Sequence, residues 1–449
     1  MSKARPTPPR AKAAAGTAAL SVPELASLFC LWALVVVPPL LVWTTAKDSF
    51  RLPKLMVATL FALGSLIGPA WSLGRLPRIS LRDLGSIPAL RAVLPLVVVA
   101  TLGLAATSHP LHVREGLIEL WVGAACLVAW SLWLTPRRAD RLFALMLGPA
   151  ALLALFAALQ FHHIWQPFRF AGAQFHGRLA VTSLVGNPAD LGAFWVIPAL
   201  WLQRSIVEHR SFRIPKFVLL ALGLYAIVIT QSFTAIAALA VGSFLFWFLV
   251  LPKKQALVLT AAGCLGLLVA TAAVGPLRVR VVEKLEAVKN RDLNRLLTGR
   301  LDGWRAAFHM FEEHPVMGVG HGAFRAAFAE ARLALVREGV VFLRTQENPI
   351  FANAHNEYLE VAAEGGLFGL AALAWAVWVF VSELQRFRRE RGAEASLRAA
   401  FSLAVGGLAA LAVLSSAFFP FRAAITAFPA LLFLAWVLRV SAATPEEAR

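Results

Sequence analysis

The sequence predicts an all-α membrane protein whose helices cross a bilayer about twelve times. Of its 449 residues, 59% are hydrophobic and only 15% are charged, and the mean hydropathy is +0.69. Soluble globular domains contain about 45–50% apolar and about 25% charged residues. Apolar stretches long enough to cross about 30 Å of hydrocarbon also recur along the whole chain. These observations exclude a soluble domain.

The apolar stretches fall into two blocks, separated by one long polar segment. They lie at about 25–43, 53–73, 88–106, 116–134, 141–161, 188–202, 215–231, 233–251, 255–276, 358–383, 397–416 and 421–440. The Pro- and Ala-rich start lacks a convincing cleavage site, so we expect a cytoplasmic tail rather than a signal peptide. We divide the chain into a disordered basic tail (1–24), nine spans (25–276), a long external loop with amphipathic helices (277–357), three spans (358–440) and a second cytoplasmic tail (441–449).

The net charge of +18 reflects orientation in the membrane rather than nucleic-acid binding, because the Lys and Arg residues are scattered between apolar runs. With twelve spans, the termini and the alternate short loops on their side carry 24 of these residues. The short loops of the other side carry 7. Positive residues collect on the cytoplasmic side of short loops, whereas long segments are largely exempt. We therefore expect both termini in the cytoplasm and segment 277–357 outside.

The three cysteines lie inside apolar runs, so we expect them to be small core residues. Elsewhere, His309, Glu313 and His314 are close in sequence, but their spacing fits no established metal site. We therefore expect neither a metal nor another cofactor.

Polar residues gather at four points that this topology places at the outer face. Asn187 followed by Pro188 predicts a helix N-cap with proline at the first helical position. The other points are residues 230–234 (TQSFT), residues 298–324 and residues 354–366. Helix N-termini favour anions, and Arg178 and Arg300 lie nearby in the sequence, which suggests a phosphate or diphosphate site. The alternative is that Asn187 and Asn356 only cap helices and that the arginines only extend to the membrane interface or pair with loop acids.

Segments 298–324 and 354–369 resemble the signature region of the O-antigen ligase and polymerase superfamily. The pattern is an Arg ahead of a Gly-Trp pair, an HPxxGxGxGxF stretch, and an HNxxL motif followed by Glu-Gly-Gly. The residues that match it are Arg300, Trp304, His314, Pro315, Gly318, Gly320, Phe324, His355, Asn356, Leu359, Glu364 and Gly365. The Gly-Asn-Pro at 186–188 also resembles a family feature.

The resemblance implies a metal-independent, inverting glycosyltransferase at the outer, periplasmic face of the bacterial inner membrane. Such enzymes take a glycan from undecaprenyl diphosphate and pass it to lipid A core (ligase) or to another lipid-linked glycan (polymerase). By analogy, His355 would be the general base or the residue that orients the acceptor, and Arg300 would bind the diphosphate. Asn187, Asn356, Glu364, Gly318 and Gly320 would support the site. The family often has Ser-Arg where this chain has Ser232-Phe233, and Arg178 is our candidate for the missing cation.

Two other classes of protein remain as alternatives. A transporter or lipid flippase would carry charged residues at mid-membrane in several spans, with broken helices in matching halves. A structural scaffold would need no convergent His, Arg and Asn residues. Between ligase and polymerase we favour the ligase, because of the single large late loop and the HNxxL match.

Overall fold

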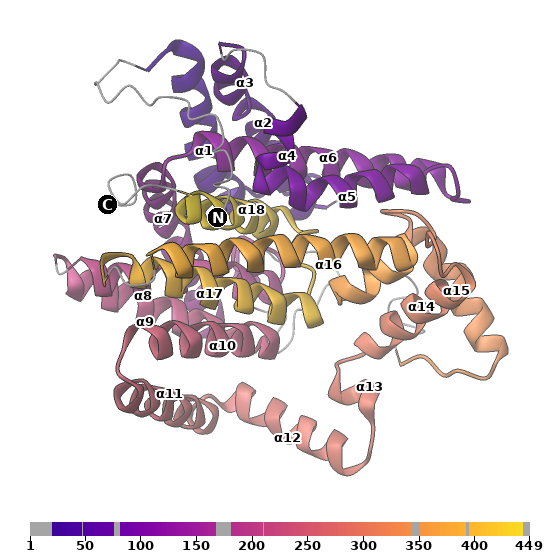
Figure 1. The fold of residues 1–449 in the computed structure, drawn as a ribbon. Helices are drawn as coiled ribbons and strands as arrows, with labels where there is room; N and C mark the ends of the chain where they lie inside the picture. The colour runs from indigo at the N-terminus through magenta and orange to yellow at the C-terminus, as the bar shows by residue number, and fades with distance from the viewer. Residues whose placement is uncertain are drawn as a thin grey trace.

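The computed structural model describes residues 20–46, 48–75, 81–167, 181–209, 211–343, 351–391 and 395–442, and within them every regular element is a helix (Figure 1). The elements are α1 (Val22–Leu40), α2 (Arg51–Gly64), α3 (Ile67–Leu73), α4 (Leu81–Ser86), α5 (Pro88–Gly103), α6 (Pro110–Trp133), α7 (Pro136–Phe161), α8 (Pro188–Glu208), α9 (Arg213–Ile229), α10 (Phe233–Val250), α11 (Lys253–Ala273), α12 (Gly275–Lys289), α13 (Leu293–Leu296), α14 (Arg300–Glu313), α15 (Phe324–Arg337), α16 (Glu357–Arg391), α17 (Ala395–Ala417) and α18 (Ala424–Ala442).

All twelve predicted apolar stretches are helical, and the prediction of an all-α polytopic membrane protein is confirmed. Among the described residues, nine helices are long and apolar enough to cross a membrane. The stretch at 53–73 consists of α2 and α3, which together count as one of these nine. The stretches at 88–106, 188–202 and 215–231 form α5, α8 and α9, which are not among the nine. The exact number of twelve crossings therefore stays a prediction.

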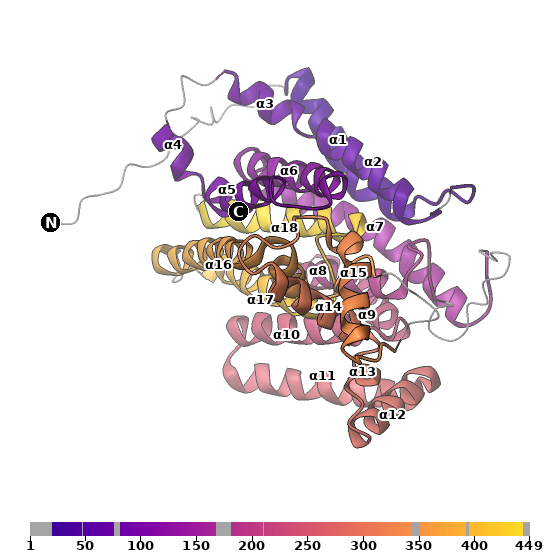
Figure 2. The same cartoon turned by 90° about the vertical axis from the view of Figure 1, so that its right-hand side faces the viewer.

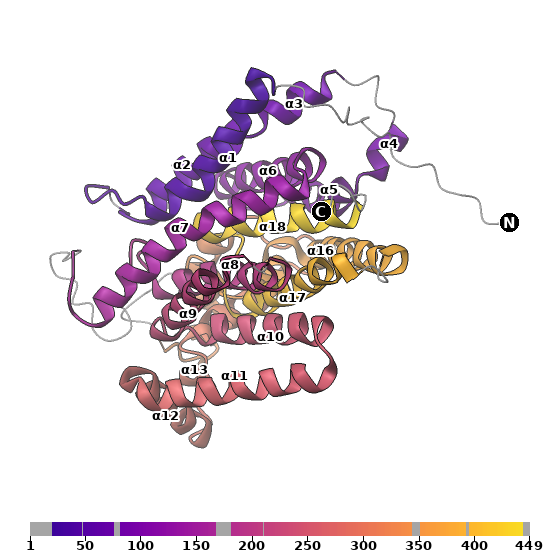
Figure 3. The same cartoon turned by 90° about the vertical axis from the view of Figure 1, so that its left-hand side faces the viewer.

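Helices α8 and α18 form the centre of the bundle, and α11 lies at its edge (Figure 3). Nearly every residue of α8 is buried, whereas Ala256 is the sole buried residue of α11. Cys264 of α11 is exposed and is therefore not the core residue that we expected, whereas Cys126 of α6 is buried. A helix that is apolar all round and open to the outside suits contact with lipid.

Helices α10 and α17 approach closely at Gly242 and Gly406, where a Cβ on Gly406 would lie 2.5 Å from the carbonyl oxygen of Gly242. Such small residues allow membrane helices to pack backbone to backbone.

The described parts of the loops that we predicted to be external come together at one end of the bundle. Helices α13, α14 and α15 lie across this end (Figure 2). We call it the loop-bearing end. The contacts that join its loops are Phe50 with Gly186, Arg51 with Asp190, Gly192 with Ser232, Gly116 with Gly322, Arg51 with Phe419 and Phe421 with Glu357.

Candidate active site

His355 lies in the turn that leads into α16, at the loop-bearing end. Its φ of 57° is a left-handed conformation that non-glycine residues rarely adopt and that often marks functional positions. The Nδ1 atom lies 3.1 Å from the carbonyl oxygen of Asn353. A carbonyl oxygen only accepts hydrogen bonds, so this contact places the proton on Nδ1. Nε2 therefore carries the lone pair and is the nitrogen able to accept a proton.

Two aromatic rings fix the orientation of the His355 imidazole. The ring of Phe351 lies 5.8 Å away between centroids, and that of Phe419 lies 5.0 Å away. Both are steeply inclined to the imidazole, at 75° and 85°. Edge-to-face contacts of this kind are favourable because the positive edge of one ring meets the negative face of the other. The imidazole is thus held in place while remaining half-exposed.

Glu360, one turn into α16, holds the backbone just before His355. Its fully buried carboxylate accepts hydrogen bonds from Nδ2 of Asn353 at 2.9 Å and from the amide of Ala354 at 2.8 Å. Asn356 caps the same helix, because its Oδ1 accepts from the amides two and three residues later at 3.0 and 3.1 Å. The cap that the sequence suggested at Asn356 is therefore present, and the strained turn is held from both sides.

A buried cluster of charges lies beneath this turn, with Arg422 at its centre. The Nη2 atom of Arg422 lies 2.6 Å from Glu364 and 3.6 Å from Glu360. Nδ1 of His321 lies 3.1 Å from the same oxygen of Glu364. Burial opposes the charge of Arg422, but the carboxylates of Glu364, Glu360 and Glu357 outweigh burial and raise the pKa of Arg422. A carboxylate inside a membrane span is costly unless paired, and the structure shows Glu364 paired.

The glycines of the HPxxGxGxGxF stretch let its backbone lie directly on α16. Gly318 and Gly320 both have positive φ values, 66° and 101°. A Cβ on Gly318 would lie 2.4 Å from the carbonyl carbon of Glu364, and the amide of Gly320 donates to the carbonyl oxygen of Glu364 at 3.0 Å. Helix α16 is broken nearby at Gly366, where φ is 59° and ψ is −151°. The HPxxGxGxGxF stretch occupies this break in α16. A larger residue at Gly318 would therefore displace the part of α16 that carries Glu364.

Arg300 begins α14, and the first turn of this helix packs against the His355 turn. The preceding residue, Gly299, has a φ of 79°, which turns the chain into the helix. A Cβ on Gly303 would lie 3.1 Å from the carbonyl oxygen of Ala354. The two segments that carry the sequence motif are therefore neighbours in space, with the half-exposed Arg300 at the helix N-terminus beside them.

A second arginine lies beside Phe233, at the turn between α9 and α10. The guanidinium of Arg280, from α12, lies 5.4 Å from the centroid of the Phe233 ring. Burial lowers the pKa of Arg280, and nearby Glu283 opposes this shift. Arg178, which we expected in this role, lies outside the described residues. The structure thus places Arg280 at the position where the resemblance led us to expect a cation.

Arg51, at the start of α2, connects two further parts of the site. Its Nη2 atom lies 3.6 Å from Oδ2 of Asp190, in the first turn of α8. Its guanidinium also lies 5.6 Å from the centroid of Phe419, the ring that contacts His355. Asn187 caps α8 as predicted, since its Oδ1 accepts from the amide of residue 189 at 2.8 Å. The helix start that carries Asn187 is thereby joined to the His355 turn through Arg51.

The family comparison concerns the segment that contains this turn. The O-antigen ligase family model matches residues 218–374. The chain carries an O-antigen ligase domain. The protein is accordingly a membrane enzyme of the O-antigen ligase and polymerase type. No curated protein matches the chain.

The matched O-antigen ligase domain contains only part of the assembled site. Phe233, Arg280, Arg300, His355, Glu360 and Glu364 lie within the match. Arg51, Asn187, Phe419 and Arg422 lie outside it and are brought in by the fold.

Sequence reasoning missed Glu360 and three arginines of the assembled site. For Glu360 a signal was available, because Glu357, Glu360 and Glu364 are spaced three and four residues apart and so share one helix face. Arg51, Arg280 and Arg422 offered no comparable signal, since each lies far from His355 in the sequence and outside the quoted motifs.

Proposed function

We propose that this protein is an O-antigen ligase that transfers a glycan from undecaprenyl diphosphate to a hydroxyl of lipid A core. The observation that carries the proposal is the His355 turn, in which a half-exposed imidazole offers Nε2 as a base beside the arginine-bearing start of α14. The matched O-antigen ligase domain supports the class of reaction. Lipid-linked glycan and a glycolipid acceptor are therefore the substrates we expect.

In the proposed reaction the acceptor hydroxyl attacks the anomeric carbon of the glycan. The new carbon–oxygen bond forms as the bond to the diphosphate breaks, and the electron pair leaves with the diphosphate. The hydroxyl proton passes to Nε2 of His355. Attack opposite the leaving group inverts the anomeric centre. Because diphosphate is a good leaving group, one base is sufficient, and no metal or other cofactor is required.

Arg300 and Arg280 bind the diphosphate in this proposal, and Arg51 adds positive charge beside them. Guanidinium groups suit phosphate oxygens because they donate two parallel hydrogen bonds and keep their charge. The charge that develops on the leaving group is stabilised by these preorganised cations. Asn187, Asn356, Glu364, Gly318 and Gly320 support the site by setting the positions of helix ends and loops.

We further propose that the loop-bearing end faces the periplasm and that both termini are cytoplasmic. The supporting observation is the excess of Lys and Arg in the termini and short loops of the opposite end, 24 against 7 in the short loops of this end. A reporter fused after Arg391 is expected to be active in the cytoplasm, and one inserted near Lys289 outside. The reverse pattern would remove the site from the periplasm.

Gene deletion followed by analysis of lipopolysaccharide tests the proposed reaction. Loss of a ligase leaves long polymer on the carrier lipid and unsubstituted core. Loss of a polymerase, the alternative within the same superfamily, leaves single repeats attached to the core. Loss of a flippase leaves the carrier-linked glycan at the cytoplasmic face. Unchanged lipopolysaccharide in the deletion strain would overturn the ligase proposal.

A further inference from the structure

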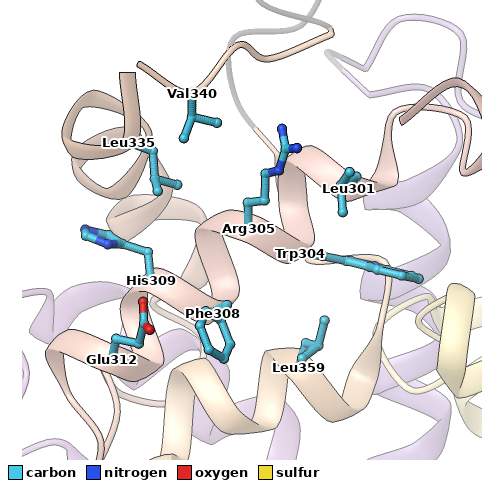
Figure 4. A pocket seen from close by; sticks show the side chains of 9 residues that line it. All are labelled: Leu301, Trp304, Arg305, Phe308, His309, Glu312, Leu335, Val340 and Leu359. Carbon is cyan, nitrogen blue, oxygen red and sulfur yellow. The ribbon is translucent and has the colours of Figure 1, made fainter. Parts of the chain in front are cut away.

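An open groove runs along one face of α14, between α15 and α16 (Figure 4). It has a cavity volume of about 360 Å³. The residues of α14 that line the groove recur at intervals of three and four positions, which places them on one face of the helix. The groove, which we call the α14 groove, is lined by Leu301, Trp304, Arg305, Phe308, His309 and Glu312 of α14, with Leu335, Val340 and Leu359 from the neighbouring segments.

The α14 groove begins beside the proposed reaction centre. Leu301 directly follows Arg300, and Leu359 lies four residues after His355. The amide of Leu359 donates to Oδ1 of Asn356 at 3.1 Å, which ties this wall to the cap of α16. Except for Leu359, the lining comes from helices that are not candidate membrane spans and from the segment after α15. The groove is thus placed to receive the part of a substrate that extends away from the membrane.

The lining combines aromatic surface with charged side chains. In Figure 4, Trp304, Leu301 and Leu359 lie on one side, and His309 and Glu312 lie on the other. Phe308 lies between them. Its side chain is 54% exposed, so its ring can contact a ligand in the groove. A hydrocarbon chain in this groove would remove water from charged groups without replacing their hydrogen bonds. A sugar ring offers apolar C–H faces to the aromatic rings and hydroxyl groups to Arg305, His309 and Glu312.

We propose that the α14 groove binds one or two sugar units of a substrate glycan next to the reaction centre. The inference rests on the proposed function, since glycan transfer is what brings a saccharide to this end of the bundle. A volume of about 360 Å³ lies near the lower end of the roughly 300–1,000 Å³ typical of small-molecule sites. It accommodates a short saccharide and not a polymer. The donor glycan and the acceptor core share this chemistry, and the experiment separates them.

The kinetic test uses the purified full-length protein in lipid nanodiscs with the variants Phe308→Ala and Glu312→Gln. Leu333→Ala and Glu313→Gln are the matched controls, because both residues are exposed and neither lines the groove. KM is measured separately for lipid-linked donor and for lipid A core acceptor. Loss of an aromatic contact is expected to raise KM for one substrate roughly 3- to 10-fold, with kcat nearly unchanged. The substrate whose KM rises identifies the glycan that occupies the groove.

A binding measurement in the His355→Ala background makes the inference separable from the proposed function. Oligosaccharide released from the donor, released core oligosaccharide and undecaprenyl phosphate are each titrated by calorimetry, with and without Phe308→Ala. Weaker binding of one oligosaccharide supports the inference. Unchanged KM values and unchanged binding of both oligosaccharides would overturn it, as would weakened binding of undecaprenyl phosphate alone. Full turnover by His355→Ala would overturn the proposed reaction instead, and the oligosaccharide titration would still decide what the groove binds.

Discussion

The loop-bearing end contains two groups of arginines that differ in how their charge is balanced. Arg422 has a side chain only 14% exposed and lies within 3.6 Å of two glutamates. Arg51 is 47% exposed, faces one aspartate at 3.6 Å and lies over an aromatic ring. Arg280 also lies over a ring. A ring stabilises a cation less than a buried carboxylate does. We infer that the Arg422 cluster holds the turn, while the ring-stacked arginines provide charge for an anionic substrate.

Arg422→Ala is expected to produce the largest effect, and the effect is on stability. The substitution leaves Glu357, Glu360 and Glu364 buried without their shared cation. Breaking a buried ion pair from one side costs about 3–5 kcal/mol. We expect a large drop in melting temperature and in the yield of folded protein. The control is Arg295→Ala, which removes a 72% exposed partner of Asp292 and is expected to cost less than about 1 kcal/mol. Equal melting temperatures for the two variants would contradict the role of the cluster.

His355→Ala is expected to leave stability nearly intact and to lower glycan transfer. Loss of a general base costs about 10²- to 10⁴-fold in rate. The measurement is transfer of labelled glycan by purified protein, beside its membrane insertion and melting temperature. His209→Ala, which alters an exposed histidine that follows α8, is the control and should transfer at the wild-type rate. A fully active His355→Ala protein would show that the mechanism is wrong.

Arg280→Ala is expected to weaken the donor site without unfolding the protein. Hydrogen bonds to charged groups contribute about 1.5–3 kcal/mol, which corresponds to roughly a 10- to 100-fold loss in kcat/KM. Arg300→Ala is expected to behave alike, and Arg300→Lys should recover only part of the activity because it lacks the planar fork. Arg278→Ala, two residues earlier and exposed, is the control. If Arg280→Ala instead melts early with normal kcat/KM, Arg280 belongs with the structural cluster.

Glu360→Gln tests whether the buried cluster acts on His355 or only on stability. Gln retains one acceptor oxygen, so one of the bonds to Asn353 and Ala354 is lost. We expect the lost hydrogen bond to raise the activation free energy by about 1.5 kcal/mol, because His355 is less well positioned. This corresponds to a roughly tenfold fall in kcat, while KM stays nearly constant. Steady-state kinetics with melting curves provide the measurement. An early-melting variant with a normal kcat would assign Glu360 to stability alone.

Chelation is expected to have the smallest effect of all. If arginines alone neutralise the diphosphate, purified enzyme should remain fully active in excess EDTA. Assays before and after chelation provide the measurement. Loss of activity with rescue by one divalent ion would show that a metal shares the task assigned to Arg280 and Arg300.

Helix ends of the site were predictable because capping depends on local sequence. Asn187 before Pro188, and Asn356 before the α16 stretch, follow rules that operate over three or four residues. Both caps are present, and the stretches that follow them are helical. The pairing of Glu364 was also foreseeable, since an unpaired carboxylate in a membrane span is costly.

The partners of these residues could not be predicted, because they come from distant parts of the chain. Arg422 pairs with Glu364 across 58 positions. Arg51 and Phe419 meet from nearly opposite ends of the sequence. The apolar face of α14 was visible as helical spacing of Leu301, Trp304 and Phe308, but spacing alone does not distinguish a membrane-facing helix from one that lines a groove.

The sequence by itself determined that the chain is a helical membrane protein, where its apolar helices lie and where two of them are capped. These properties depend on composition and on neighbours within one or two helical turns. Only the tertiary structure decided that the described parts of the predicted external loops meet at one end, that Glu360 accepts hydrogen bonds from the His355 turn and that the Arg280 guanidinium lies over the ring of Phe233. The reason is physical: whether a charge is paired, buried or available to a ligand depends on which distant segments surround it.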